Sequence, residues 1–138
     1  MIKNLNLFFL ILFLTACGNT QSESASTDCT NAFAVISVLD GALLNECGCD
    51  EAAGTSTQAG ETFTCTIPAN KSVLFDYSKA KDPHQIISVG SPSFTSSPIS
   101  QSSQSHKILS HVDQFVSTGT YVFKDRFLET LQGQIVVR

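Results

Sequence analysis

The sequence predicts an all-β domain of the β-sandwich class, in which turn residues separate short strands. No segment has a sustained apolar period of 3.6 residues, which an amphipathic helix requires. Short runs rich in β-branched and aromatic residues are instead bounded by Gly, Pro, Asn, Asp and Ser, a pattern typical of antiparallel sandwiches. The clearest alternation is at Val73, Phe75 and Tyr77.

The first 17 residues predict export from the cytoplasm and attachment of lipid. Lys3 supplies a positive charge, and residues 5–14 are almost wholly Leu, Phe and Ile, which is typical of a secretory signal. This run is shorter than the ~20 apolar residues that span a bilayer. Residues 14–17 read Leu-Thr-Ala-Cys and resemble the lipobox of bacterial lipoproteins, although an ordinary signal peptide with a chance cysteine is the alternative.

The lipobox resemblance implies a location. It implies that the signal is removed before Cys17, which then carries acyl chains such as palmitate and joins the protein to a membrane. Gly18, rather than Asp, follows this cysteine, which implies transport to the outer membrane on its periplasmic side. Acyl chains hold a protein stably when more than one is attached.

Removal of residues 1–16 would leave 122 residues, enough for one domain but not for two. Residues 18–28 are polar and predict a flexible tether. We therefore expect a signal at residues 1–16, a lipidated cysteine and tether at residues 17–28, and a single domain at residues 29–138. Loss of Lys3 changes the formal charge from −4 to −5, and without basic clusters we expect no nucleic-acid binding.

Four further cysteines, which are Cys29, Cys47, Cys49 and Cys65, predict two disulfides in an exported chain. A bridge from Cys47 to Cys49 would close a very small, strained ring, so that pairing is excluded. Two pairings stay open, each linking Cys29 and Cys65 to Cys47 and Cys49. The rival interpretation is a soft-metal site, since the Cys-x-Cys thiolates suit Cu(I) or Zn(II).

The strands are expected in the following order. Residues 32–39 form the first and end at Asp40-Gly41, and residues 42–44 add a short strand or a helical turn. A loop at residues 47–60 precedes strands at residues 62–67 and 72–77, which we expect to pair through a short turn. The later strands are expected at residues 85–89, 107–115, 121–124 and 134–137, with a serine-rich surface loop at residues 91–105.

Residues 62–137 resemble a cupredoxin domain of the plastocyanin and azurin type. The matching segments are Ile-Pro-Ala-Asn-Lys at residues 67–71, Pro-His at 83–84, Ser-Pro-Ser-Phe at 91–94 and Gly-Thr-Tyr at 119–121. The resemblance implies a Greek-key β-sandwich, with residues 29–60 supplying the first strands and a disulfide-bearing insertion. Tyr121 is expected to fix the corner before the last hairpin.

Blue copper needs a thiolate, two imidazoles and usually a weak axial thioether. The resemblance implies that His84 is the first ligand of that set. In the family pattern Cys-x-x-His-x-x-Met-x-Gly, Asp125 falls on the cysteine, Leu128 on the second histidine and Leu131 on the methionine. A longer-loop alignment would place the second histidine at Thr130. Neither alignment supplies the thiolate, the second imidazole or the thioether. We interpret Leu128 and Leu131 as residues that fill the site by apolar packing.

His84 and Asp125 are weak candidates for a nitrogen–oxygen site for Cu(II) or Zn(II). A second imidazole would have to come from His106 or His111, but these lie five apart around a predicted strand and would point to opposite faces. A lone histidine is ordinarily not a metal site. No Gly-x-Ser-x-Gly turn indicates a hydrolase.

The sequence thus predicts a lipid-anchored envelope protein, without cofactor, that acts as a non-enzymatic binding or structural module. Its partners would be the membrane, through Cys17, and an envelope protein. The alternative is a copper protein with a non-blue site, used in metal storage, handoff or electron transfer.

Overall fold

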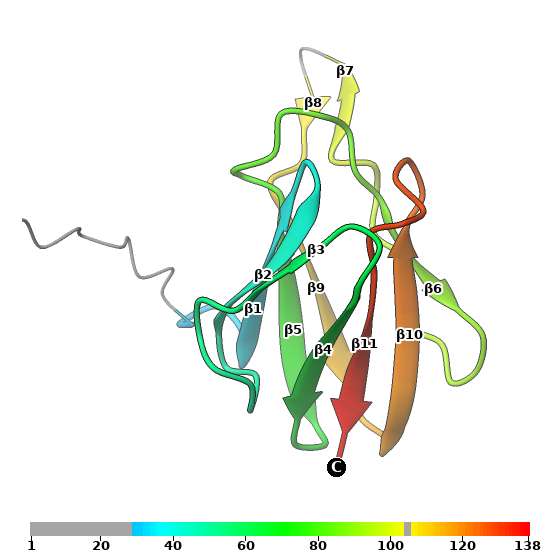
Figure 1. The fold of residues 1–138 in the computed structure, drawn as a ribbon. Helices are drawn as coiled ribbons and strands as arrows, with labels where there is room; N and C mark the ends of the chain where they lie inside the picture. Colours follow the sequence, from blue (N-terminus) through cyan, green and yellow to red (C-terminus); the bar gives the residue numbers. More distant parts are fainter. Residues whose placement is uncertain (1–28, 104–105) are drawn as a thin grey trace, which may run out of the picture.

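The computed structural model describes residues 29–103 and 106–138, in which two main β-sheets pack face to face (Figure 1). Residues 1–28, with the predicted signal, Cys17 and tether, lie outside the described residues. The all-β prediction is confirmed, since the described part of the chain holds no helix. It accordingly offers no helix long and apolar enough to cross a bilayer.

The strands divide between the sheets in an order different from that of the sequence. The first sheet has the spatial order β3 (Ser56–Gln58), β2 (Ala42–Cys47), β1 (Ala34–Leu39), β5 (Lys71–Asp76) and β9 (Ser110–Phe115). The second sheet has the order β4 (Thr62–Ile67), β11 (Gln132–Val137), β10 (Gly119–Asp125) and β6 (Ile86–Val89). A small ribbon pairs β7 (Gln101–Ser103) with β8 (His106–Lys107).

The core lies between the inner faces of the two sheets. Val73, Phe75 and Tyr77 are fully buried, which confirms the alternation predicted for this strand. The ring of Phe75 contacts that of Phe123 edge to face, with centroids 5.3 Å apart, so aromatic packing joins β5 to β10. Tyr121 forms the expected corner, because its hydroxyl donates to the carbonyl oxygen of Ser117 at 2.9 Å.

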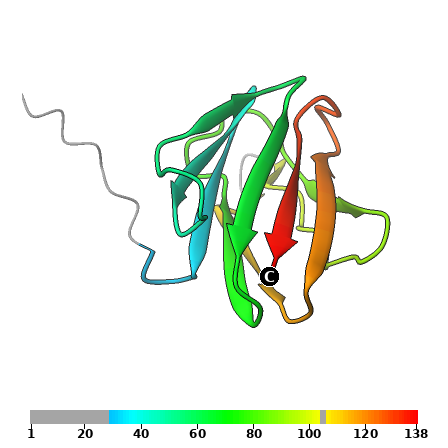
Figure 2. The same cartoon turned by 60° about the horizontal axis from the view of Figure 1, so that its bottom comes forward.

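The expected pairing of residues 62–67 with residues 72–77 is wrong. β4 and β5 lie in different sheets, and the turn between them carries the chain across the sandwich (Figure 2). Asn70 adopts a left-handed conformation in this turn, with φ of 62°. Both strands bury alternate residues in the shared core, so they face each other across it instead of exchanging backbone hydrogen bonds.

The antiparallel arrangement is only partly right. β1 pairs with β5, and β4 pairs with β11, in parallel, whereas the other strand pairs are antiparallel. A short turn can join only antiparallel strands, whereas parallel strands need a long connection between them. In each parallel pair here, at least one strand of the other sheet lies between the two partners in the sequence.

Residues 42–44 begin a strand, which confirms one of the two expected alternatives. Three other local expectations need correction. β3 lies in the predicted loop at residues 47–60, and β7 lies in that at residues 91–105. The predicted strand at residues 107–115 is divided between β8 and β9. Bulges and short edge pairings of this kind leave little trace in periodicity.

The cysteines form two bridges, as predicted, in one of the two open pairings. Cys29 is bonded to Cys47 and Cys49 to Cys65, with Cα–Cα distances of 6.3 and 4.9 Å. Cys65 lies on β4, so the second bridge ties the loop after β2 to the opposite sheet. Gly48 stands between the bridges with φ of +85°, and a Cβ there would lie 1.9 Å from the carbonyl oxygen of Phe33. Only glycine fits this close approach.

Candidate functional site

Three connections meet at the end of the sandwich drawn uppermost in Figure 1. They are the β1–β2 turn, the β5–β6 connection and the β10–β11 loop. Each contributes one titratable side chain to a common cluster, which consists of Asp40, His84 and Asp125. We call this cluster the Asp–His–Asp cluster.

Both ring nitrogens of His84 face carboxylates. Nδ1 lies 3.0 Å from Oδ2 of Asp125, and Nε2 lies 3.3 Å from Oδ1 of Asp40. The histidine side chain is 3% exposed and that of Asp125 is fully buried, whereas that of Asp40 is 33% exposed. The cluster therefore runs from the interior of the domain to its surface.

The carboxylate of Asp125 is held by backbone amides as well as by the imidazole. Oδ1 accepts hydrogen bonds from the amides of Phe127 and Leu128 at 2.7 and 2.8 Å, and Oδ2 accepts one from the amide of Gln85 at 3.1 Å. An ionised carboxylate is an acceptor only, and four donors surround this one if Nδ1 of His84 carries a proton. The sequence places an aspartate where this loop needs an acceptor for its exposed amides.

Asp40 closes the cluster at the surface. Its Oδ1 accepts hydrogen bonds from the amides of Lys81 and Asp82, both at 2.9 Å. The amide of Asp82 has the largest effect and lowers the pKa of the Asp40 carboxyl, while burial opposes it to a smaller extent. The amide of Lys81 and the side chain of His84 lower this pKa further. Asp40 is thus an anion that joins the β1–β2 turn to the β5–β6 connection.

His84 is surrounded by groups that favour its protonated form. Burial by itself lowers the pKa of His84, but hydrogen bonds to Asp125 and Asp40 and the negative charges of both outweigh it, so the pKa is raised from 6.5. The backbone of His84 is also fixed, because its amide donates to Oγ of Ser100 at 2.9 Å and its carbonyl accepts from the amide of Ser100 at 2.8 Å.

The three degenerate ligand positions lie close together, with Asp125 as the last residue of β10 and the two leucines in the β10–β11 loop. The amide of Asp125 donates to the carbonyl of Leu131, and the amide of Leu131 donates to that of Leu128, both at 2.8 Å. Leu131 is 1% exposed, and Leu128 packs against the core. Thr130, the alternative position for the second histidine, is exposed.

The other histidines do not join the cluster as far as the structure describes them. His106 and His111 lie on two different strands, β8 and β9, so the expectation of one shared strand is wrong. His111 contacts Asp113, with Nε2 2.8 Å from Oδ2. The structure does not describe the side chain of His106.

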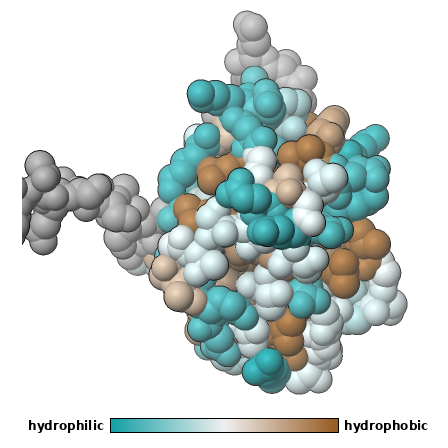
Figure 3. All heavy atoms as spheres, viewed as in Figure 1, coloured by the Kyte–Doolittle hydropathy of each residue, from teal (hydrophilic) through white to brown (hydrophobic). Residues whose placement is uncertain are grey.

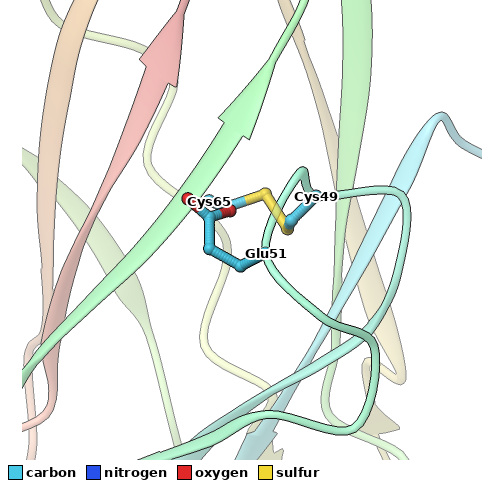
Figure 4. A group of neighbouring side chains, drawn as sticks. All are labelled: Cys49, Glu51 and Cys65. Carbon is cyan, nitrogen blue, oxygen red and sulfur yellow. A yellow bond between two sulfur atoms is a disulfide. The ribbon is translucent and has the colours of Figure 1, made fainter.

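Among the described residues, a second group with metal-binding residue types lies at the second disulfide (Figure 4). Ligand atoms of Cys49, Glu51 and Cys65 lie within 4.8 Å of one another. The two sulfurs are bonded to each other, so neither is a thiolate. Glu51 accepts hydrogen bonds from the amide and hydroxyl of Thr66, both at 2.9 Å, and so attaches this loop to β4.

The geometry of the Asp–His–Asp cluster limits its chemistry. The carboxylates contact opposite nitrogens of one ring, so they cannot converge with it on a single ion. An ion on Nδ1 would have the imidazole and Asp125 as protein ligands, and would have to displace the hydrogen bond between them. Sequence reasoning paired His84 with Asp125 but missed Asp40, which lies 44 residues away and was interpreted only as a turn residue.

Solved structures of cupredoxins have the same fold. A purple cupredoxin from Nitrosopumilus maritimus matches 76% of this chain and 99% of its own, at 19% identity and a TM-score of 0.50. The oxidised form of an amicyanin mutant matches 77% of this chain and 82% of its own, at 15% identity and a TM-score of 0.49. No family model and no curated protein sequence matches this chain. The described domain thus has a cupredoxin-like fold, as its sequence resemblance implied.

Proposed function

We propose that this chain is a lipid-anchored protein of the bacterial envelope whose cupredoxin-like domain has lost the blue-copper ligands. The domain acts as a non-enzymatic binding or structural module. One observation carries the proposal, which is that Asp125, the residue that the family pattern aligns with the cysteine ligand, lies 3.0 Å from Nδ1 of His84. This pair joins the β5–β6 connection to the end of β10, and Asp40 adds the β1–β2 turn.

The absence of a thiolate ligand has a spectroscopic consequence. Sulfur-to-copper charge transfer produces the intense colour of blue-copper sites, and Asp125 cannot provide it. The four donors around this carboxylate would lose hydrogen bonds on binding a cation. We therefore expect weak Cu(II) binding and no intense visible band.

Metal content and copper titration of the purified mature domain test this proposal. We expect substoichiometric copper on isolation and equally weak binding in the wild type and in His84→Ala. His111→Ala is the matched control, since His111 also contacts one carboxylate but lies outside the cluster. Stoichiometric copper that is lost in His84→Ala and kept in His111→Ala would overturn the proposal.

That outcome would favour the second candidate, a copper protein with a non-blue site. The proximity of an imidazole and a carboxylate, 3.0 Å apart, favours this alternative as a nitrogen–oxygen pair for Cu(II). Its role would be metal storage, handoff or electron transfer.

The geometry of the cluster supports a non-enzymatic role. A histidine acts as a base for nucleophilic catalysis when one nitrogen faces the nucleophile and the other an orienting group. In His84 both nitrogens face carboxylates, so neither is directed at a hydroxyl or thiol. An envelope protein is the expected partner.

The lipid anchor is tested separately through Cys17. Cells fed a tagged fatty acid should label the wild-type chain, while Cys17→Ser should stay unlabelled and retain its signal segment. The variant Cys29→Ser is a control, because it removes a cysteine outside the lipobox. Equal labelling of the wild type and Cys17→Ser would contradict the anchor and the outer-membrane location.

A further inference from the structure

The outer face of the first sheet carries aligned apolar side chains. Val35, Leu74 and Val112 are direct cross-strand neighbours on β1, β5 and β9, and their side chains point away from the core. Phe33 lies immediately before β1, and Leu109 lies immediately before β9. We call these five residues the apolar face.

Several of these side chains are open to solvent. Phe33, Leu109 and Val112 are 37%, 51% and 47% exposed, whereas Leu74 is partly buried and Val35 is only 1% exposed. Val35, Leu74 and Leu109 also line a shallow cavity of about 270 Å³, whose other lining residues, Asn31, Asp76, Ser78 and Ser110, are polar. A contiguous apolar area with a polar rim is a feature of surfaces that bind a partner or a membrane.

The outer face of the second sheet carries both polar and apolar side chains. In Figure 3, hydrophilic and neutral residues separate the apolar ones over β4, β11 and β10. The outward residues of β11 and its neighbour β4 include Gln132, Gln134 and Thr64. The exposed Val122 on β10 lies between Gln134 on β11 and Val89 on β6, and Val89 is 40% exposed. Exposure of apolar side chains therefore does not by itself distinguish the two faces.

The position at which the chain enters the domain indicates which face is nearest to the lipidated Cys17. The described chain begins at Cys29, which is bonded to Cys47 at the end of β2, and passes through Phe33 into β1 (Figures 1 and 2). Only residues 18–28 separate Cys29 from Cys17. Eleven residues reach about 40 Å when fully extended, since each residue spans at most ~3.6 Å.

We propose that the apolar face lies against the lipid bilayer to which Cys17 is anchored. This inference rests on the proposed lipid anchor. The short tether keeps the domain at a high effective concentration near the membrane, and it enters beside the apolar face. Apolar side chains then enter the boundary between headgroups and acyl chains, as in other proteins that lie on a membrane.

The charge of the domain indicates which lipid it suits. Lys71 lies with its Nζ 5.3 Å from the centroid of the Phe33 ring, at the border of the apolar face. The mature chain has a formal charge of −5, however, so it has no overall attraction to anionic lipid. The contact therefore depends on apolar burial and suits a zwitterionic lipid surface.

The chain contains no tryptophan, so one introduced residue can report on its surroundings. We would purify the full-length lipidated chain with Val112→Trp and place it in phosphatidylcholine vesicles, with and without bromine on the acyl chains. Val122→Trp is the matched control, because Val122 is 42% exposed on the other sheet. Co-sedimentation with the vesicles measures the anchor independently.

We expect a blue-shifted emission and bromine quenching for Val112→Trp and neither for Val122→Trp. Adding Leu109→Asp to Val112→Trp should abolish the quenching while the protein still sediments with the vesicles. Equal quenching in the two single variants, or none in either, overturns the inference and leaves the anchor in place.

The Val112→Trp emission could instead shift to the blue with increasing protein concentration and show no quenching by bromine. That result would show that a second copy of the chain covers the apolar face, and it would also overturn the inference. A lipidated chain that fails to sediment with vesicles would contradict the anchor, and the inference with it.

Discussion

Nδ1 of His84 lies 3.0 Å from Oδ2 of Asp125, across 41 residues of sequence, in the interior of the domain. The pair joins the β5–β6 connection to the β10–β11 loop, and Asp40 extends it to the β1–β2 turn. An imidazolium between two carboxylates can satisfy all three groups, whereas one buried charge without a partner destabilises a fold strongly. The stability of this end of the domain therefore depends on the complete cluster.

The variant Asp125→Ala should lower the free energy of unfolding by about 3–5 kcal/mol, because it leaves Nδ1 of His84 and three backbone amides without their acceptor. Urea denaturation at neutral pH measures the change. Asp50→Ala is the control, since Asp50 is exposed and its substitution should change stability by less than about 0.5 kcal/mol. A similar small change in both variants would show that the cluster contributes little.

The stability should fall as the pH rises above the ordinary histidine pKa of 6.5. The raised pKa of His84 means that the folded domain keeps a proton that the unfolded chain releases. This contribution is complete below the ordinary histidine pKa and is lost as the pH passes the folded value. The slope between these two values is at most about 1.4 kcal/mol per pH unit.

Urea denaturation checks this dependence over a range from about pH 6 to about pH 9, which brackets the titration of a histidine with a raised pKa. In His84→Gln the slope over this range should be smaller, because the group that keeps the proton is removed. An unchanged slope in the variant would assign the pH dependence to other groups.

The triple variant Asp125→Cys, Leu128→His and Leu131→Met should restore the blue-copper ligand types in the required order beside His84. The three positions belong to one hydrogen-bonded loop, which places them near one another. Cu(II) should then give an intense visible band from thiolate charge transfer. The double variant without Asp125→Cys should stay colourless, and a folded but colourless triple variant would contradict the loop alignment.

The disulfide Cys49–Cys65 should contribute more stability than Cys29–Cys47. Their sequence separations of 16 and 18 residues are similar, so the two entropic contributions are similar. Cys65, however, is fully buried in the core. Replacing Cys49 and Cys65 by Ala should cost about 2–5 kcal/mol, and replacing Cys29 and Cys47 should cost less.

Urea denaturation of the two double variants compares the bridges. Thiol titration of the unreduced, denatured wild type should find no reactive thiol among these four cysteines, and peptide mapping should recover the two pairs. Four reactive thiols in protein isolated from the envelope would favour the soft-metal interpretation.

The sequence alone allowed several strands and the ligand positions to be predicted, because these follow from local patterns. The alternation at Val73, Phe75 and Tyr77 follows from a strand with one buried face. The positions of Asp125 and Leu131 follow from spacing within one short loop. The even number of cysteines beyond Cys17 predicted two bridges, because an exported chain with four such cysteines can pair all of them.

Only the tertiary structure decided which segments meet. Local periodicity tells which side of a strand is buried but not which strand lies beside it, so the separation of β4 and β5 into two sheets was missed. The choice between the two cysteine pairings and the contact of Asp40 with His84 were undetermined for the same reason. Both join segments distant in sequence, and packing of the whole sandwich fixes their proximity.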